Sequence, residues 1–214
     1  MKQKKQKKFP GFLITLEGGE GVGKSTQSVR LRQRLIDKGK DVIILREPGG
    51  TAISEQIRQV VLSPDNTSMA FTTEVLLFQA ARAQIYRELV LPSLKAGKIV
   101  VMDRSRDSSV VYQGMVRDFG KELIDQLNDL STGHTLPDLT ILFDLPVEIG
   151  LERRNRSGEI NRLDMETTQF HQKVRQAYLE LVEEDKTGRW VVVDAKQSLE
   201  QIEEEIWKIV ETRL

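Results

Sequence analysis

The sequence contains no cysteine and only two histidines. Without cysteine the chain has no disulfide bond, no thiolate nucleophile and no cysteine ligand for a metal, and this composition favours a cytoplasmic location. The two histidines, His134 and His171, are far apart along the chain. We therefore expect packing or surface roles for both of them rather than a histidine metal site or a catalytic triad.

Neither sign of charge is in excess. Lysine plus arginine and aspartate plus glutamate number 32 each in the 214 residues, so the formal net charge is zero. A neutral chain has no overall field that attracts nucleic acid or a membrane surface, and we expect neither as a partner. Any binding of anions must then be local.

Long hydrophobic runs are also missing, because no apolar stretch approaches the length of a membrane-spanning helix. The basic run at residues 1–8 has no apolar segment after it, which is not the pattern of a secretory signal. We expect residues 1–10 to form a flexible basic arm, and a tether to nucleic acid or lipid headgroups is the less favoured interpretation. With 39% hydrophobic residues in the chain, residues 11–214 are enough for one domain.

A glycine-rich segment near the N-terminus has the most specific pattern. Gly18, Gly23, Lys24 and Ser25 stand at the spacing G-x-x-x-x-G-K-[ST] of a phosphate-binding loop, or P-loop. An apolar run at residues 12–16 precedes the segment and a helical pattern follows it, which is the strand-loop-helix context that the motif requires. A chance glycine-rich turn is a poor alternative in this context.

Each residue type in this loop has a physical role. The glycines let successive N–H groups point at one anion, and the N-terminus of the following helix adds partial positive charge. Lys24 can reach the β- and γ-phosphates, and the Ser25 hydroxyl can bind a Mg²⁺ that bridges them. We therefore predict a site for ATP, with Mg²⁺ bound by Ser25. The predicted contacts are Gly18, Gly19, Glu20, Gly21, Val22, Gly23, Lys24, Ser25 and Thr26.

Short apolar runs alternate with helical patterns along the chain. Strands are predicted at residues 12–16, 41–46, 98–103, 138–144 and 190–194, and one of the helical patterns runs from 72 to 91. A strand, a helix and a second strand form a βαβ unit, which requires parallel strands and a right-handed crossover. We predict an α/β fold of the P-loop NTPase kind, in which helices cover both faces of a five-stranded parallel sheet.

Polar residues gather at the predicted carboxyl ends of two strands, where ligands bind in open α/β sheets. Residues 46–51 follow the second strand, and Asp103, Arg104 and residues 105–113 end and follow the third. Their position in the fold favours a ligand site over a long solvated loop.

Three further segments leave alternatives open. Phe78 and Arg82 share a helix face, which suits stacking and hydrogen bonding to a planar ligand but also suits packing with a surface ion pair. Arg58 fits a ligand site or the surface equally well. Residues 153–164 contain four arginines and Gly158 without apolar periodicity, which predicts a mobile cationic lid above the P-loop; an exposed loop is the alternative.

With these motifs in this order, the chain resembles the thymidylate kinases of the bacterial type from residue 13 nearly to its end. The matching positions are 16–27, 46–50, 57–58, 61–62, 77–78, 81–82, 103–104, 107–109, 112–114 and 161–164. The resemblance implies that the γ-phosphoryl group of ATP is transferred with Mg²⁺ to dTMP, which gives dTDP for dTTP synthesis. It also implies a homodimer.

The resemblance assigns roles to residues of this chain. Phe78 would stack on thymine, Arg82 would donate to its O4, and Ser109 and Gln113 would complete the base pocket. The remaining implied substrate contacts are Tyr112 against the deoxyribose, Glu20 at the 3′-hydroxyl, Arg46, Arg58 and Arg104 at the dTMP phosphate, Ser108 beside them, and Glu47 near the metal and phosphates.

The implied catalytic set is Lys24, Arg104, Asp103, Glu20 and one lid arginine. The family carries a catalytic arginine in either the P-loop or the lid, and this P-loop has none. Arg153 is the best match, with Arg154 and Arg156 as alternatives. One departure from the family is Ser105, because an aromatic residue or histidine commonly follows the Asp-Arg pair.

Two other functions remain open at this point. A kinase for another nucleotide or a deoxynucleoside would use the same P-loop with a different base pocket. Arg82 favours dTMP over a cytosine nucleotide, because an arginine donates to a carbonyl and cytosine has an amino group at that position. A non-catalytic P-loop module that holds nucleic acid through the basic arm would bind in a salt-sensitive way.

Overall fold

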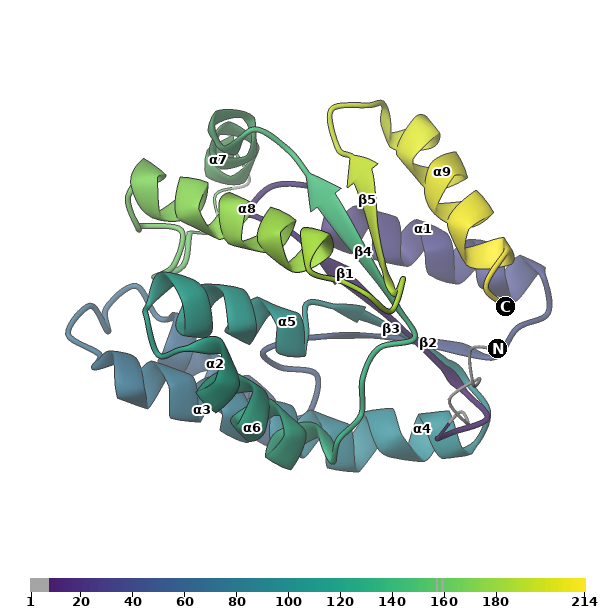
Figure 1. The fold of residues 1–214 in the computed structure, drawn as a ribbon, viewed down its shortest axis with the longest axis horizontal. Coiled ribbons are helices and arrows are strands. Elements are labelled where there is room, and N and C mark those ends of the chain that lie inside the picture. The colour runs from purple at the N-terminus through teal and green to yellow at the C-terminus, as the bar shows by residue number, and fades with distance from the viewer. Residues whose placement is uncertain (1–7, 157, 159) are drawn as a thin grey trace.

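The computed structural model describes residues 8–156, 158 and 160–214. Five strands form one parallel sheet in the order β2-β3-β1-β4-β5 (Figure 1). The strands are β1 Phe12–Glu17, β2 Val42–Arg46, β3 Ile99–Asp103, β4 Leu139–Asp144 and β5 Trp190–Asp194. The predicted number of strands and their parallel direction are confirmed.

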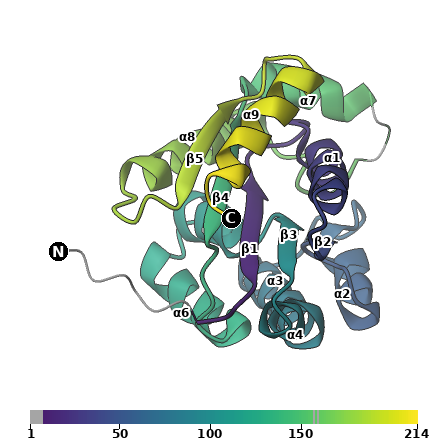
Figure 2. The same cartoon turned by 90° about the vertical axis from the view of Figure 1, so that its right-hand side faces the viewer.

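The sheet is buried on both faces, as is typical of parallel sheets. Because side chains alternate along a strand, Ile14 and Leu16 of β1 pack with α1 (Lys24–Asp37) and α9 (Leu199–Glu211), whereas Leu13 packs with the opposite layer of helices. Figure 2 shows α1 and α9 on one side of the strands and α3 and α4 on the other.

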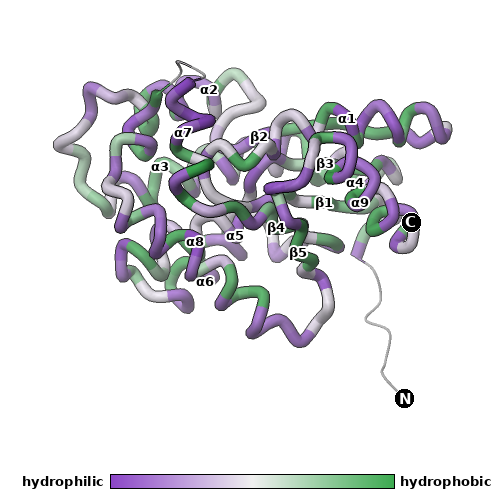
Figure 3. The backbone as a smooth tube through the Cα atoms, turned by 90° about the horizontal axis from the view of Figure 1, so that it is seen from above, coloured by the Kyte–Doolittle hydropathy of each residue, from purple (hydrophilic) through white to green (hydrophobic). Residues whose placement is uncertain are grey.

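Helices of the second layer bring polar side chains to the sheet as well as apolar ones. This layer contains α3 Phe71–Ile85, α4 Leu91–Lys95 and α8 Thr168–Glu183, with α2 Ala52–Leu62 and α6 Lys121–Thr132 packed against α3. Hydrophobic and hydrophilic residues alternate along these helices in Figure 3, as expected when one face of each helix is buried. The predicted covering of both faces is confirmed.

Two helical regions differ from the expected pattern. The single helix expected at 72–91 is divided into α3, a π-helical segment Tyr86–Val90, and α4, which has Pro92 in its first turn. A second π-helical segment, Val110–Val116, follows the short helix α5, Arg106–Ser109. Such wide turns are common at functional sites, and the second segment carries Tyr112 and Gln113.

The arginine-rich segment predicted as a lid begins within a helix. Helix α7, Val147–Arg156, includes Arg153, Arg154 and Arg156, so these arginines lie on its last turns and not on a loop. Leucine, glutamate and arginine favour helix even where apolar periodicity is absent. Residues 157 and 159 of the expected lid lie outside the described residues.

The strand register brings the site together. Leu16 of β1 and Arg46 of β2 are both paired with Asp103 of β3, so the segments after these strands leave the sheet at one level. This level is the carboxyl edge of the sheet, where we expected ligands to bind.

None of the helices within the described ranges is both long enough and apolar enough to cross a membrane. Residues 1–7 of the expected basic arm lie outside the described residues. Lys8 donates a hydrogen bond to the carbonyl of Gly133 (2.5 Å).

Candidate active site

A cavity of about 420 Å³ opens at the carboxyl edge of the sheet. Its wall joins the P-loop to the segments after β2 and β3, to α3 and to the end of α7. The predicted site residues on this wall are Glu20, Gly21, Val22, Gly23, Lys24, Ser25, Thr26, Arg46, Glu47, Arg58, Phe78, Arg82, Asp103, Arg104, Ser108, Ser109, Tyr112, Gln113 and Arg153.

The P-loop takes its shape from close packing against β4 and α7. A side chain at Gly21, whose φ is 65°, would place its Cβ 2.0 Å from the carbonyl oxygen of Gly150. Only glycine fits there without displacing the backbone of α7. The glycine sequence therefore allows the loop to lie directly under the first turns of that helix.

Lys24 crosses the mouth of the loop. Its Nζ donates to the carbonyl oxygens of Gly18 (3.2 Å) and Gly19 (2.6 Å), the two predicted contact residues that are not on the cavity wall. Burial, followed by the charge of Arg104, lowers the pKa of Lys24 to about 8. A buried ammonium held by two carbonyls alone is a strong partner for a phosphate oxygen.

Oxygen ligands for a divalent cation lie beside this lysine. The Ser25 hydroxyl donates to the carboxylate of Asp103, which is the last residue of β3. A hydroxyl and a carboxylate are the hard oxygen ligands that Mg²⁺ binds in phosphate sites. The donor set at Ser25 and Asp103 therefore fits this ion.

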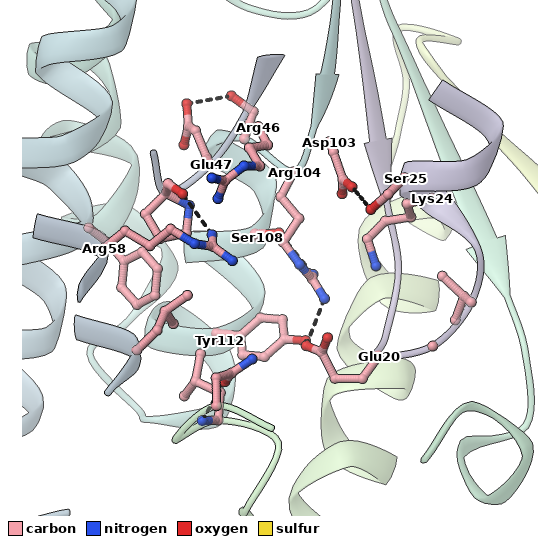
Figure 4. A pocket seen from close by; sticks show the side chains of 18 of the residues that line it. Glu20, Lys24, Ser25, Arg46, Glu47, Arg58, Asp103, Arg104, Ser108 and Tyr112 are labelled. Atoms are coloured by element: carbon pink, nitrogen blue, oxygen red, sulfur yellow. Dashed lines mark hydrogen bonds and ion pairs between the residues drawn. The ribbon is translucent and has the colours of Figure 1, made fainter. Parts of the chain in front are cut away.

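Arg104 lies in the middle of the cavity, between the arginines on one side and the P-loop on the other (Figure 4). Its Nη2 donates to Glu20 Oε1 (2.7 Å), to which the Tyr112 hydroxyl also donates (2.9 Å). Burial alone raises the pKa of Glu20, but the charges of Arg104 and Lys24 and the Tyr112 hydrogen bond lower it to about 2. Glu20 is therefore an ionised acceptor that spans the gap between the P-loop and Arg104.

Arg46 and Arg58 complete a cationic wall opposite the P-loop (Figure 4). Arg46 is paired with Glu55 (2.9 Å), and Arg58 Nη1 donates to the carbonyl oxygen of Pro48 (2.7 Å). Burial, followed by the charge of Arg46, lowers the pKa of Arg58. Arg58, for which the sequence left two interpretations, thus lies at the cavity and not on the outer surface.

Arg82 is almost completely buried, with 1% of its surface exposed. Its Nε donates to Glu47 Oε2 (2.8 Å), Nη1 to Ser109 Oγ (3.0 Å) and Asn128 Oδ1 (2.7 Å), and Nη2 to the Ser105 carbonyl (3.1 Å). A guanidinium has five N–H groups, and these contacts with described residues use four. Among the described residues these contacts leave one N–H of Nη2 unassigned, and Arg82 itself is part of the cavity wall.

A comparison with known families agrees with this geometry. The family model described as thymidylate kinase matches residues 16–206. The chain belongs to the thymidylate kinase family. It is therefore a kinase that acts on dTMP. The cavity is lined both by its P-loop and by the separate wall of arginines.

Glu47 lies on the cavity wall, and its carboxylate pairs with Arg82. Burial raises the pKa of Glu47, against the opposing effect of Arg82. The pair is almost fully withdrawn from solvent, with 2% and 3% of the two side chains exposed. Glu47 thus holds Arg82 in place from behind.

The arginines of α7 lie at the outer rim of the cavity. Arg153 and Arg154 both line it, and Arg153 Nη1 donates to the Ala195 carbonyl (3.4 Å) while Arg154 Nε donates to Asp164 (3.0 Å). Arg156 is exposed and pairs with Glu152 on its own helix. This arrangement favours Arg153 or Arg154 over Arg156 as the lid arginine of a thymidylate kinase.

Ser105, the departure from the family pattern, is fully buried. Its Oγ hydrogen bonds to the Tyr86 hydroxyl (2.9 Å), and its N–H donates to Glu17 Oε1 (2.8 Å). Tyr86 is the first residue of the π-helical segment that follows α3. Its hydroxyl is therefore the polar partner of the residue next to the Asp-Arg pair.

Sequence reasoning missed three residues that support the site. They are Glu17, Asn128 and Tyr178, none of which is in the predicted set of site residues. A carboxylate at the end of an otherwise apolar strand was the one available indication for Glu17, because a buried charge needs partners. Nothing in the local pattern of α6 or α8 distinguishes Asn128 or Tyr178.

Proposed function

We propose that this protein transfers the γ-phosphoryl group of ATP to dTMP, with Mg²⁺, and that both nucleotides bind in the cavity described above. The observation that carries the proposal is that one cavity is lined by a P-loop, by a separate wall of arginines and by the buried Arg82 beside Phe78. Transfer between two anions requires positive charge around both of them and exclusion of water.

The P-loop side suits ATP. Lys24, the N–H groups at the start of α1 and the glycine-rich backbone would bind its phosphates, because the helix N-terminus has no side-chain cap that competes for them. Ser25 and Asp103 would hold Mg²⁺, which neutralises charge on the transferring group. Breaking the lysine's contacts with Gly18 and Gly19 would release its ammonium for a phosphate oxygen.

The opposite side suits dTMP. Arg46, Arg58 and Arg104 would bind its phosphate, and Glu20, which is ionised, would accept a hydrogen bond from the 3′-hydroxyl. Tyr112, held through its hydroxyl by Glu20, would lie where a ribose 2′-hydroxyl would protrude.

The base pocket lies deeper in the cavity. Phe78 would stack on thymine, and the Nη2 of Arg82 would donate to O4. Ser109 and Gln113 fix the pocket's walls, since Ser109 accepts from Arg82 and Gln113 donates to the buried Glu74 (2.8 Å). Ser108 would support Arg104, to which its Oγ is hydrogen bonded (3.3 Å).

We also propose that the protein is a homodimer. Large apolar side chains are exposed on three neighbouring helices, α2, α3 and α6, where a second copy would cover them. They are Ile53, Val60, Phe71, Leu76, Leu123 and Leu130. Light scattering after size-exclusion chromatography should give twice the mass of one chain, and a monomer at micromolar concentration would contradict this part of the proposal.

The kinase proposal is tested by ADP release with ATP and Mg²⁺ in the presence of dTMP, dUMP, dCMP, dAMP, dGMP or UMP. Clear preference for dTMP is the expected result. Equal use of a cytosine nucleotide would place Arg82 outside the base pocket, and no stimulation by any monophosphate would leave only nucleotide binding. Salt-sensitive binding of nucleic acid that depends on residues 2–8 would then support the non-catalytic alternative.

A further inference from the structure

Glu17 is a fully buried carboxylate to which the proposed function assigns no role. It is the last residue of β1, and none of its surface is exposed. Its Oε1 accepts from the Ser105 N–H (2.8 Å), and its Oε2 accepts from the hydroxyls of Ser108 (2.6 Å) and Tyr178 (2.9 Å). A buried carboxylate is stable only with such partners, so the question is what its position serves.

The backbone and the guanidinium group of Arg104 are both next to Glu17 or its partners. Its backbone has a φ of 64°, an unfavourable value for a residue with a side chain, and the next N–H, that of Ser105, is bonded to Glu17. Its guanidinium Nη1 donates to Ser108 Oγ and to the Tyr178 hydroxyl (3.3 Å each), which are the two hydroxyls that Glu17 Oε2 binds. One carboxylate thus contacts the backbone and the side-chain supports of the same arginine.

We propose that Glu17 is a positioning residue for dTMP binding, which holds Arg104 in place through the Ser105 backbone and through the hydroxyls of Ser108 and Tyr178. A carboxylate only accepts hydrogen bonds, so it draws both hydroxyl protons toward itself and leaves oxygen lone pairs for the guanidinium. The inference rests on the proposed function, in which Arg104 binds the dTMP phosphate.

The surroundings of Glu17 keep its charge sensitive to pH. Burial and the neighbouring carboxylate of Asp107 raise its pKa to about 7, against the opposing effects of Ser108, Arg104 and the Ser105 N–H. Asp107 is itself held by Arg189 (2.7 Å). Five titratable or charged groups interact with Glu17. They are Lys24 at the start of α1, Arg104 just after β3, Asp107 of α5, Tyr178 of α8 and Arg189 just before β5.

The test is Glu17→Gln, which keeps the shape of the side chain and an oxygen for the Ser105 N–H. Its amide would donate to the two hydroxyls and reverse their orientation at Arg104. We expect the KM for dTMP to rise about tenfold, the effect of roughly one charge-assisted hydrogen bond, with the KM for ATP and the thermal midpoint little changed. Glu184→Gln, which removes an exposed carboxylate paired with Lys121, is the control for loss of charge and should leave both KM values unchanged.

The pH profile separates positioning from simple packing. As the pH falls below about 7, the wild-type carboxyl becomes neutral like the amide, so the ratio of the two KM values for dTMP should shrink toward one; above pH 7 it should reach its full size. Titration of the dTMP phosphate affects both enzymes alike and cancels in this ratio. A ratio that does not change with pH contradicts the inference.

Tyr178→Phe provides a second test that does not require a change at Glu17. It should raise the KM for dTMP about threefold, less than Glu17→Gln, because one of two hydroxyls remains. The double variant should resemble Glu17→Gln alone, since both changes act on the same support. Additive effects, or equal effects on dTMP and ATP, contradict the inference, whereas a wild-type protein that phosphorylates no monophosphate contradicts the proposed function instead.

Discussion

The two sides of the cavity are built in different ways. On the side proposed for ATP, one continuous segment supplies the glycine backbone, Lys24 and Ser25, with Asp103 as a neighbour from β3. On the side proposed for dTMP, the groups come from several elements, and most of their contacts join residues far apart in the sequence. The Arg82 contacts, for example, reach Glu47, Ser105, Ser109 and Asn128.

This difference teaches that the P-loop side is shaped largely by backbone conformation, whereas the opposite side is held together by long-range side-chain pairs. In the proposed function, a change on one side should therefore have a different signature from a change on the other. Removing a buried, paired charge on the side proposed for dTMP should disturb the fold and dTMP use together, whereas removing Lys24 on the side proposed for ATP should disturb turnover more than the fold.

Arg82→Ala, on the side proposed for dTMP, should have the largest effect of these changes on stability and on dTMP use. Removing the guanidinium leaves the buried Glu47 without its partner, which we expect to lower the free energy of unfolding by about 3–5 kcal/mol. Urea denaturation measures this loss. In whatever folded protein remains, dTMP use should fall while ATP binding is retained; equal losses for both nucleotides would place Arg82 outside the base pocket.

Lys24→Ala removes the ammonium group from the side proposed for ATP. Turnover should fall about 10²-fold or more, because one preorganised charge-stabilising donor is lost. The preference for dTMP over dUMP and dCMP in residual turnover should stay as it is in the wild type, since the base pocket is not touched. Near-normal turnover would refute the phosphate role of this lysine.

Gly21→Ala sharpens the claim that the P-loop depends on backbone conformation. Gly21 and Gly39 have φ values of 65° and 71°, but a Cβ meets the Gly150 carbonyl only at Gly21, whereas it meets nothing within 4 Å at Gly39. Gly39→Ala should cost about 1 kcal/mol of unfolding free energy, and Gly21→Ala about 1–2 kcal/mol more with weaker ATP binding. If the two variants lost the same unfolding free energy in thermal or urea denaturation, the backbone of α7 would move aside for the Cβ at little cost.

The pH dependence of ATP use should give the smallest effect. Since the pKa of Lys24 is lowered to about 8, the ammonium loses its proton as the pH rises above that value, and kcat/KM for ATP should fall up to about tenfold per pH unit. Initial rates between pH 7 and 10 at saturating dTMP measure this decline. A flat profile through pH 9.5 would mean that Lys24 stays charged in the free enzyme.

The sequence was sufficient for the sheet and the P-loop because both follow local rules. Five apolar runs separated by helical patterns specify a parallel sheet, and the spacing of Gly18, Gly23, Lys24 and Ser25 specifies the loop between β1 and α1. The family pattern also supplied Arg58, whose local context fitted the surface equally well, and Phe78 and Arg82, whose local context also suited packing with a surface ion pair. All three lie on the cavity wall.

What the sequence did not supply is the second layer of contacts. Glu17, Tyr178 and Asn128 are buried polar residues whose partners lie on other elements: Tyr178 of α8 donates to Glu17 of β1, and Arg82 of α3 donates to Asn128 of α6. The helical end of α7 is also not evident from the apolar pattern, because residues 153–156 are helical but lack the apolar spacing that marks most helices.

The most direct test of the account is a crystal structure with dTMP and a non-hydrolysable ATP analogue. The account predicts thymine against Phe78 with O4 at the Nη2 of Arg82, the monophosphate on Arg46, Arg58 and Arg104, and the triphosphate on the P-loop. If dTMP were bound elsewhere, or with its base at the arginine wall and its phosphate at Arg82, the assignment of the two sides would be wrong.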